Sequence, residues 1–153
     1  MDLVNFIIKA KIAGYATGGE KQELKFDDGS IGFKFEIDGY KYIDRYYGFN
    51  PFSGTEHVYD SDEALIWKMN YYGEIIGTPS DPKIVYGFLR EAMASITPEY
   101  PFRGPAKMVK GNLIYANQQD GTLDAFNGYE AIYENENKIY YLHYHGGNMQ
   151  RNT

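Results

Sequence analysis

The chain has 153 residues, a formal net charge of −6, an aromatic fraction of 17% and no cysteine. This length supports one domain that buries roughly 70% of its unfolded surface, and so many aromatic residues exclude an intrinsically disordered chain. The acidic balance without a Lys/Arg cluster excludes direct nucleic-acid binding, and the lack of cysteine excludes disulfides and indicates a reducing compartment.

Apolar residues recur at helical spacing from Asp2 to about Ala13, and Asp2 is placed to cap this helix. Gly14 and the Gly18-Gly19 pair predict its end, followed by a polar loop over residues 20–30. The N-terminus lacks the basic region and unbroken apolar run of a signal peptide. Because no stretch approaches the ~18 apolar residues of a membrane span, we expect a soluble, cytoplasmic protein without membrane contact.

Two hairpins are predicted next. Residues 31–37 and 40–47 alternate between apolar and polar, and Asp38-Gly39 between them is typical of a type I′ hairpin turn. A connecting loop over residues 48–54 leads to a further hairpin, which runs from Gly54 to about Ile75.

The second half begins with a helix, for which Ser80 or Asp81 is the expected cap and Pro82 the first residue. Its apolar stripe over residues 83–95 consists of Ile84, Phe88, Leu89 and Ala92. The two prolines of residues 100–105 exclude a helix or a central strand there. A hairpin about Lys110-Gly111 follows, and a last hairpin spans residues 128–146.

The hairpin of residues 54–73 recurs in residues 128–146, with one residue dropped at the turn. Gly54, Glu56 and Tyr71 align with Gly128, Glu130 and Tyr144. This recurrence predicts an α+β fold of two tandem helix-plus-antiparallel-strand repeats, about 1–76 and 82–149, within one domain of residues 1–153. We expect a pseudo-twofold axis, an antiparallel sheet packed against two helices, and a ligand cleft between the halves.

Strand alternation assigns the two faces of the last strand in each hairpin. Trp67, Met69 and Tyr71 share one face and are predicted core, as are the aligned Tyr140, Leu142 and Tyr144. The opposite face carries Lys68, Asn70 and Tyr72, aligned with Tyr141, His143 and His145. That second face either meets solvent or forms the wall of a cleft.

Several residues are candidates for chemistry. His143 and His145 project from one strand face and could share a metal, with His57 or one of the carboxylates as a third ligand. Ordinary hydrogen bonding is preferred, and we assign no metal and no cofactor. Glu56 and Glu130 either cap backbone N–H groups or attract a cationic, planar ligand. Arg103 clamps an anion or pairs with an acid, and pairing is favoured. The candidate ligand-binding set is Glu56, Trp67, Asn70, Tyr72, Arg103, Glu130, His143 and His145.

No nucleophile elbow, phosphate-binding glycine loop or HExxH zinc motif occurs in the sequence. The first functional hypothesis is therefore a module that binds a small cationic or aromatic molecule. The alternatives are a homodimerisation or protein-interaction domain, and an enzyme that uses Glu or His for acid–base chemistry.

The segments Trp67–Gly73, Tyr100–Pro105 and His145–Gly147 together resemble an uncharacterised bacterial domain family over nearly the whole chain. Members of that family occur alone or behind a Cro/C1-type helix-turn-helix. The resemblance implies the stand-alone form here, because the first helix leads directly into the domain. It also implies a sensor or oligomerisation module, and it supplies no mechanism.

Overall fold

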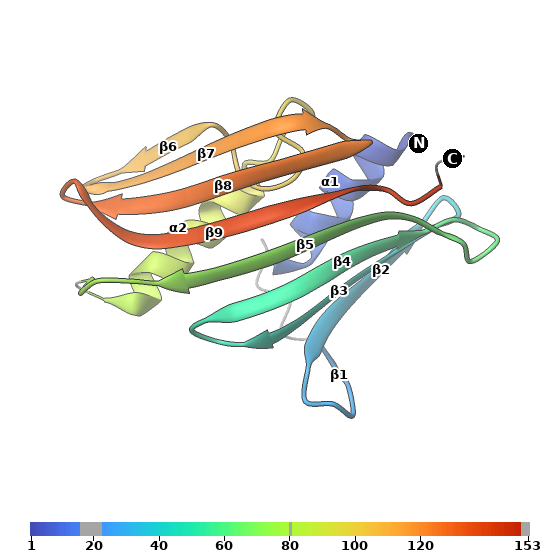
Figure 1. Cartoon of the computed structure of the whole chain (residues 1–153), viewed down its shortest axis with the longest axis horizontal. Helices are drawn as coiled ribbons and strands as arrows, with labels where there is room; N and C mark the ends of the chain where they lie inside the picture. Colours follow the sequence, from blue (N-terminus) through green and yellow to red (C-terminus); the bar gives the residue numbers. More distant parts are fainter. Residues whose placement is uncertain (16–22, 80, 151–153) are drawn as a thin grey trace.

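The computed structural model describes residues 1–15, 23–79 and 81–150. The loop predicted at Gly18-Gly19 and the capping alternative Ser80 therefore lie outside the described residues. Antiparallel strands dominate the described chain, and two helices accompany them (Figure 1). The strands are β1 (Leu24–Lys25), β2 (Ile31–Ile37), β3 (Tyr40–Gly48), β4 (Phe52–Tyr59), β5 (Leu65–Ile75), β6 (Lys107–Lys110), β7 (Leu113–Thr122), β8 (Ala125–Glu134) and β9 (Asn137–Asn148).

All the strands belong to one nine-stranded sheet in the order β1-β2-β3-β4-β5-β9-β8-β7-β6. The prediction of a balanced α+β fold with two helix-plus-strand repeats was therefore wrong, because the sheet is continuous and dominates the molecule. Strands β5 and β9 pair along nine positions, from Trp67 opposite Asn148 to Ile75 opposite Tyr140. This pairing merges the two groups of strands into one layer, and each group contributes only one short helix.

Most local elements within this sheet agree with their predictions, but strand β1 lies inside the polar loop that was predicted over residues 20–30. Asp38 and Gly39 have φ values of 52° and 82°, the left-handed conformation that a type I′ turn requires at both central positions. The hairpins β4–β5 and β8–β9 both form. Residues 100–105 belong to no helix and no strand, as their prolines predicted, and Tyr100 makes only an isolated β-bridge with Thr97.

Helix α1 (Leu3–Ala13) begins at Asp2, whose side chain accepts a hydrogen bond from the backbone N–H of Asn5. Helix α2 (Pro82–Ala94) begins at Asp81, the predicted cap, with Pro82 in its first turn. Its buried stripe includes Phe88, Leu89 and Ala92, but Ile84 is exposed and Val85 is buried in its place. Both helices are too short and too polar to cross a membrane, and the described residues contain no longer one.

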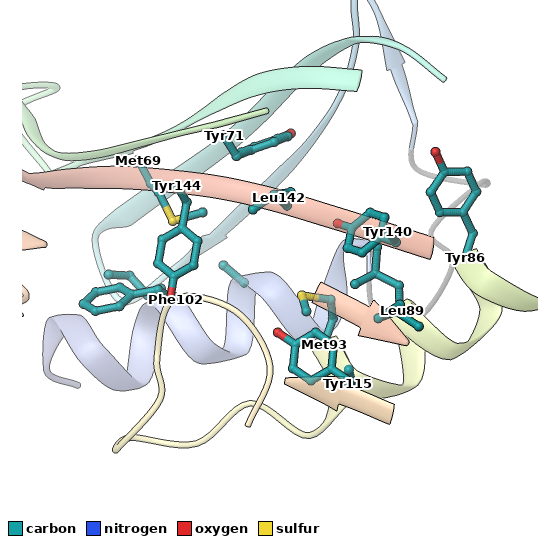
Figure 2. Close-up of a cluster of buried hydrophobic side chains, with 14 of the residues drawn as sticks. Met69, Tyr71, Tyr86, Leu89, Met93, Phe102, Tyr115, Tyr140, Leu142 and Tyr144 are labelled. Carbon is teal, nitrogen blue, oxygen red and sulfur yellow. The ribbon is translucent and has the colours of Figure 1, made fainter. Parts of the chain in front are cut away.

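The helices lie on one side of the sheet, which we call the inner face (Figure 1). Helix α1 contacts β2, β3 and α2, and α2 contacts β7. Trp67, Met69 and Tyr71 point to this side and are buried, which confirms the predicted core face of β5. Tyr140, Leu142 and Tyr144 of β9 are buried on the same side and meet Leu89 and Met93 of α2 (Figure 2). The functional side chains must therefore share the inner face with the core or lie on the open outer face.

Candidate functional site

Two glutamates are buried on the inner face, where carboxylates are costly unless they are paired. Glu56 of β4 lies 2.7 Å from the Nζ atom of Lys11, a residue of α1. The Tyr42 hydroxyl donates a second hydrogen bond to this carboxylate at 2.5 Å. Lys11 also donates to the carbonyl oxygen of Phe102 at 2.6 Å. Burial lowers the pKa of Lys11, and the adjacent Glu56 opposes that shift.

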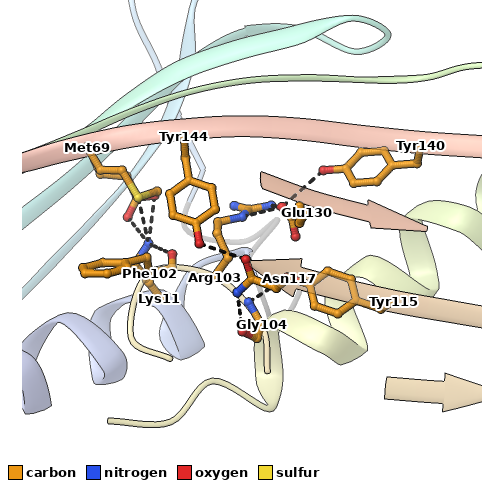
Figure 3. A network of polar contacts seen from close by, with 11 residues as sticks. Lys11, Met69, Phe102, Arg103, Gly104, Tyr115, Asn117, Glu130, Tyr140 and Tyr144 are labelled. Carbon is orange, nitrogen blue, oxygen red and sulfur yellow. Dashed lines mark hydrogen bonds and ion pairs between the residues drawn. The ribbon is translucent and has the colours of Figure 1, made fainter. Parts of the chain in front are cut away.

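The second glutamate, Glu130 of β8, is 0% exposed and pairs with Arg103 (Figure 3). The Nε and Nη2 atoms of Arg103 lie 2.6 and 2.5 Å from the same oxygen, Oε1. Arg103 therefore pairs with an acid within the protein, which was the favoured reading of this residue. Neither glutamate accepts a hydrogen bond from a backbone N–H group of the described residues, and each is paired with a cation of the chain itself.

Each glutamate faces a polar residue on the neighbouring strand. Asp44 lies opposite Glu56, and Asn117 lies opposite Glu130. Directly opposed residues of an antiparallel pair share one face, so both polar side chains point to the inner side. Tyr71 donates to Asp44 Oδ1 at 2.6 Å, and Tyr144 donates to Asn117 Oδ1 at 2.8 Å. The two environments therefore contain matching groups.

Glycines opposite these tyrosines make room for their rings. Gly54 faces Tyr71 across β4–β5, and Gly128 faces Tyr144 across β8–β9. A Cβ atom on Gly54 would meet the Tyr71 hydroxyl, and one on Gly128 would meet the Tyr144 ring closer than atoms can approach. Each tyrosine can therefore lie across the neighbouring strand and reach the polar residue beyond it.

A cavity of about 130 Å³ lies beside Asp44. Its walls are mostly aromatic, with an acid and two arginines among them. The lining residues are Tyr15, Asp44, Tyr46, Gly48, Phe49, Phe52, Tyr71, Tyr86, Arg90 and Arg103. A smaller space of about 20 Å³, lined by Lys11, Tyr42 and Glu56 among others, shares Tyr15, Asp44 and Arg103 with it. The buried Lys11–Glu56 pair thus lies next to the cavity.

Asp44 is the cavity-wall carboxyl whose pKa this setting moves toward neutrality. Burial raises the pKa of its carboxyl to about 7, and the neighbouring Glu56 adds to the shift. The hydrogen bond from Tyr71 acts in the opposite direction. A carboxyl whose pKa lies near neutrality, in a cavity, is a typical feature of a functional site. Asp44 was not among the residues that we singled out in the sequence.

The structure divides the predicted site residues between both sides of the sheet. Glu56 and Arg103 line the cavities, while Glu130 is bonded to Arg103. Trp67 is fully buried and stacks on Phe126, with ring centroids 5.6 Å apart. Trp67 therefore belongs to the core, and lines neither of these cavities.

The remaining predicted site residues lie on the outer face. Tyr72, His143 and His145 are exposed, and Asn70 is half-buried. None of them lines the two cavities beside Asp44 and Glu56, and the exposed side chains of Tyr72, His143 and His145 meet solvent. The part of the chain that the structure describes contains no group of three or more His, Asp and Glu residues able to hold a metal ion.

Alternation on β3 carried a usable signal for the missed acid. Asp44 is two residues from both Tyr42 and Tyr46, so these side chains share one strand face. Tyr42 is buried, and its face is the inner one. An acid in phase with a core-facing tyrosine is a candidate for a perturbed carboxyl. Lys11 of α1, Arg90 of α2 and Arg103 of the loop after α2 also line the cavities. Strand alternation could not predict that these residues lie near Asp44.

Comparison with known proteins adds a family. A family model described as a domain of unknown function, DUF5680, matches residues 44–149, from Asp44 to the end of β9. No curated protein and no solved structure matches the chain. The matched segment includes Glu56, Arg103 and Glu130, and it covers well over half of the sequence. The chain therefore belongs to the DUF5680 family of domains of unknown function.

Proposed function

We propose that this protein is a binding module for a small aromatic molecule, which occupies the cavity beside Asp44. The observation that carries the proposal is the cavity itself, about 130 Å³ with Tyr, Phe, Asp and Arg side chains in its wall. Apolar walls with a few convergent polar groups are typical of ligand sites. Such a wall buries an aromatic ring, and Asp44 and Arg103 orient its substituent.

The volume limits the ligand to about one ring. An engineered protein cavity of about 150 Å³ binds benzene, whereas sites for drug-sized ligands occupy roughly 300–1,000 Å³. A single six-membered ring with one short polar group fits the space beside Asp44. Larger ligands would have to displace Phe49, which is 71% exposed and lies in the cavity wall.

The charges in the wall favour an aromatic ligand over a permanent cation. Arg90 lines the cavity without an acidic ion-pair partner among the described residues, and its guanidinium group would repel a cationic ligand. Glu56 and Glu130 do not offset this repulsion, because Lys11 and Arg103 already neutralise them. The cationic alternative of the first hypothesis is therefore the weaker one.

Thermal unfolding with phenol as the probe tests the proposal. A ligand at a hundredfold excess over its Kd stabilises the folded state by about 2.7 kcal/mol, so phenol should raise the Tm. Phe52→Trp enlarges a side chain in the cavity wall and should abolish the shift. The matched variant Tyr72→Trp enlarges an exposed ring on the outer face and should keep it.

Two controls keep this experiment decisive. If Phe52→Trp does not fold, Tyr46→Trp replaces it, because Tyr46 is half-buried in the same wall. Benzylamine should give a smaller shift than phenol, because its cation faces Arg90. An equal phenol shift in the cavity variant and the outer-face variant would contradict binding in this cavity.

Homodimerisation through the outer face is the second candidate function. Tyr129, Tyr141 and His143 form a ring cluster there, with the Tyr129 and His143 centroids 4.8 Å apart. Tyr72, opposite His143 on β5, is 44% exposed. Exposed aromatic surface is typical of interaction sites. Light scattering should then show a dimer that Tyr129→Ser/Tyr141→Ser dissociates, and a strict monomer at high concentration would contradict it.

The biological role that we propose follows the resemblance of the sequence. Similar domains placed behind a helix-turn-helix support a sensor function, in which a bound metabolite is the signal. Cytoplasmic location fits a chain without cysteine. In this proposal the protein binds its ligand without contacting DNA.

A further inference from the structure

Among the described residues, two charged side chains in the cavity wall lie outside the buried ion pairs. Lys11 pairs with Glu56, and Arg103 pairs with Glu130. Arg90 and Asp44 remain in the cavity wall, and Arg90 has no carboxylate within ion-pair distance among the described residues. The guanidinium of Arg90 lies over the Tyr15 ring, 5.7 Å from its centroid. When Asp44 carries a proton, the cavity wall therefore has one uncompensated positive charge.

Asp44 has hydrogen-bonding capacity left for a ligand. Its Oδ1 atom accepts from the Tyr71 hydroxyl at 2.6 Å. Within the described residues, no donor bonds its other oxygen, Oδ2. Arg103 also keeps its Nη1 atom free of described partners, since Nε and Nη2 hold Glu130. A carboxyl oxygen and a guanidinium nitrogen are thus available in the wall of one cavity.

We propose that the cavity takes its ligand as a small aromatic carboxylate together with one proton, which stays on Asp44. This inference rests on the proposed binding function and adds the ligand's chemical class. Asp44 Oδ2 takes the proton from solvent and donates it in a hydrogen bond to the ligand carboxylate. Arg90 and Arg103 supply the positive charge that the anion requires.

The proton is required because two facing carboxylates cannot both be ionised at hydrogen-bonding distance. An aromatic acid bound beside ionised Asp44 would meet a like charge in a site of low polarity. Protonated Asp44 removes that repulsion and becomes a donor. The bound carboxylate then balances Arg90, so the occupied site is neutral.

Other titratable groups around Asp44 leave it as the group that responds to pH. Glu56 raises the pKa of Asp44, while Lys11 and Arg103 lower it. The neighbouring tyrosines, whose pKa values are raised by burial, stay protonated in the neutral range. Glu23 and Glu74 act on the pKa values of the wall residues Tyr46 and Tyr86. The other titratable and charged groups around the cavity are Lys11, Tyr15, Tyr42, Tyr46, Glu56, Tyr71, Tyr86, Arg90 and Arg103.

Binding of benzoate as a function of pH tests the inference. With the pKa of Asp44 at about 7, the Kd for benzoate should be constant from about pH 5.5 to 6.5 and then rise about tenfold per pH unit above 7. Calorimetry at pH 8 in buffers of different ionisation enthalpy should show uptake of close to one proton per benzoate.

Asp44→Asn gives the matched variant, because its amide is a permanent hydrogen-bond donor of the same shape as the protonated acid. This variant should bind benzoate at pH 8 as tightly as at pH 6. Arg90→Gln should weaken benzoate about tenfold or more and weaken phenol much less, because phenol carries no charge. Benzoate binding by the native protein that is equal at pH 6 and pH 8, or loss of benzoate in Asp44→Asn at both values, would overturn the inference.

Phenol separates this inference from the proposed function. If phenol binds and benzoate does not, the cavity is a ligand site and the carboxylate assignment is wrong. If neither compound binds, both the proposed function and the carboxylate assignment are wrong. Stronger binding of benzylamine than of benzoate at pH 6 would also contradict the assignment.

Discussion

The two hairpins β4–β5 and β8–β9 place the same groups in the same relation, yet only one of them lies beside the 130 Å³ cavity. In the first, Glu56 faces Asp44, and Tyr71 bonds Asp44. In the second, Glu130 faces Asn117, and Tyr144 bonds Asn117. In each place the glutamate, the opposite polar residue and the tyrosine form what we call a polar frame. The two frames differ in the acid or amide at the opposite position, and in the cation, Lys11 or Arg103, that pairs with the glutamate.

The frame around Asn117 is closed, in the sense that both ends of its side-chain amide bond to groups of the protein. Its amide nitrogen donates to the carbonyl of Gly104 at 2.8 Å, and its oxygen accepts from Tyr144. The Gly104 N–H in turn donates to the Tyr115 hydroxyl at 3.0 Å. Asn117 therefore uses both ends of its amide within the fold (Figure 3). Asp44 uses one oxygen, which leaves the other for a ligand or a proton.

The largest expected effect comes from breaking the closed frame. Glu130→Gln leaves the Arg103 guanidinium buried without its counter-charge, and Arg does not release its proton in proteins. Such a change costs about 3–5 kcal/mol. Glu56→Gln should cost less, because burial already lowers the pKa of Lys11 and this amine can become neutral. Urea unfolding of both variants measures the difference, and equal losses would contradict this ranking.

Asp44→Asn tests the comparison, because it places at position 44 the same amide side chain that Asn117 carries in the second hairpin. The carboxyl pKa rises from 3.8 to about 7 in the folded protein. Folding therefore favours protonated Asp44, and this stabilisation is complete below about pH 4 and is lost as the pH rises through 7. Relative to Asp44→Asn, the native protein should lose up to about 1 kcal/mol per pH unit in this window.

Unfolding free energies measured at pH 4, 5.5, 7 and 8.5 check that slope. Above pH 7 the difference between the native protein and Asp44→Asn should stay constant. A difference that is flat from pH 4 to 8.5, or a native protein that gains on the variant as the pH rises, would show that the Asp44 carboxyl is not perturbed in this direction.

The smallest expected effect is on the outer face. Tyr72→Ser removes an exposed ring from the centre of the sheet, and exposed substitutions usually change stability within about 0.5 kcal/mol. The same variant should bind phenol as the native protein does. Thermal unfolding with and without phenol tests both statements, and a lost phenol shift would move the ligand site to the outer face.

Local sequence patterns predicted the hairpins, the helix caps and the core face of β5 correctly. Asp-Gly is favoured in type I′ turns, which require left-handed conformations at both central positions. Asp81-Pro82 is a typical helix start, with an N-cap residue followed by proline. The single continuous sheet was not predicted, because the residue pattern of β5 and β9 does not indicate that these two strands pair with each other. That pairing turns two hairpins into one sheet.

The candidate site was predicted in part for the same reason. Glu56 and Arg103 stood out through a repeated position and a rigid loop, and both line the cavities. His143 and His145 were singled out as a pair on one strand. Both helices lie on the other side of the sheet (Figure 1), so the two histidine side chains are exposed to solvent. Asp44 acquires its character from Glu56, Tyr71 and burial, which are contacts between strands and depend on the complete fold.

The measurement that tests the central claim most directly is a titration of the ¹⁵N-labelled protein with phenol, followed by NMR. The account predicts that the amide signals of Phe49, Phe52 and Tyr86 shift along one saturable curve. Those of Tyr72 and His143, on the outer face, should stay in place. Saturable shifts confined to the outer face, or no saturable shift at any residue, would contradict a ligand site beside Asp44.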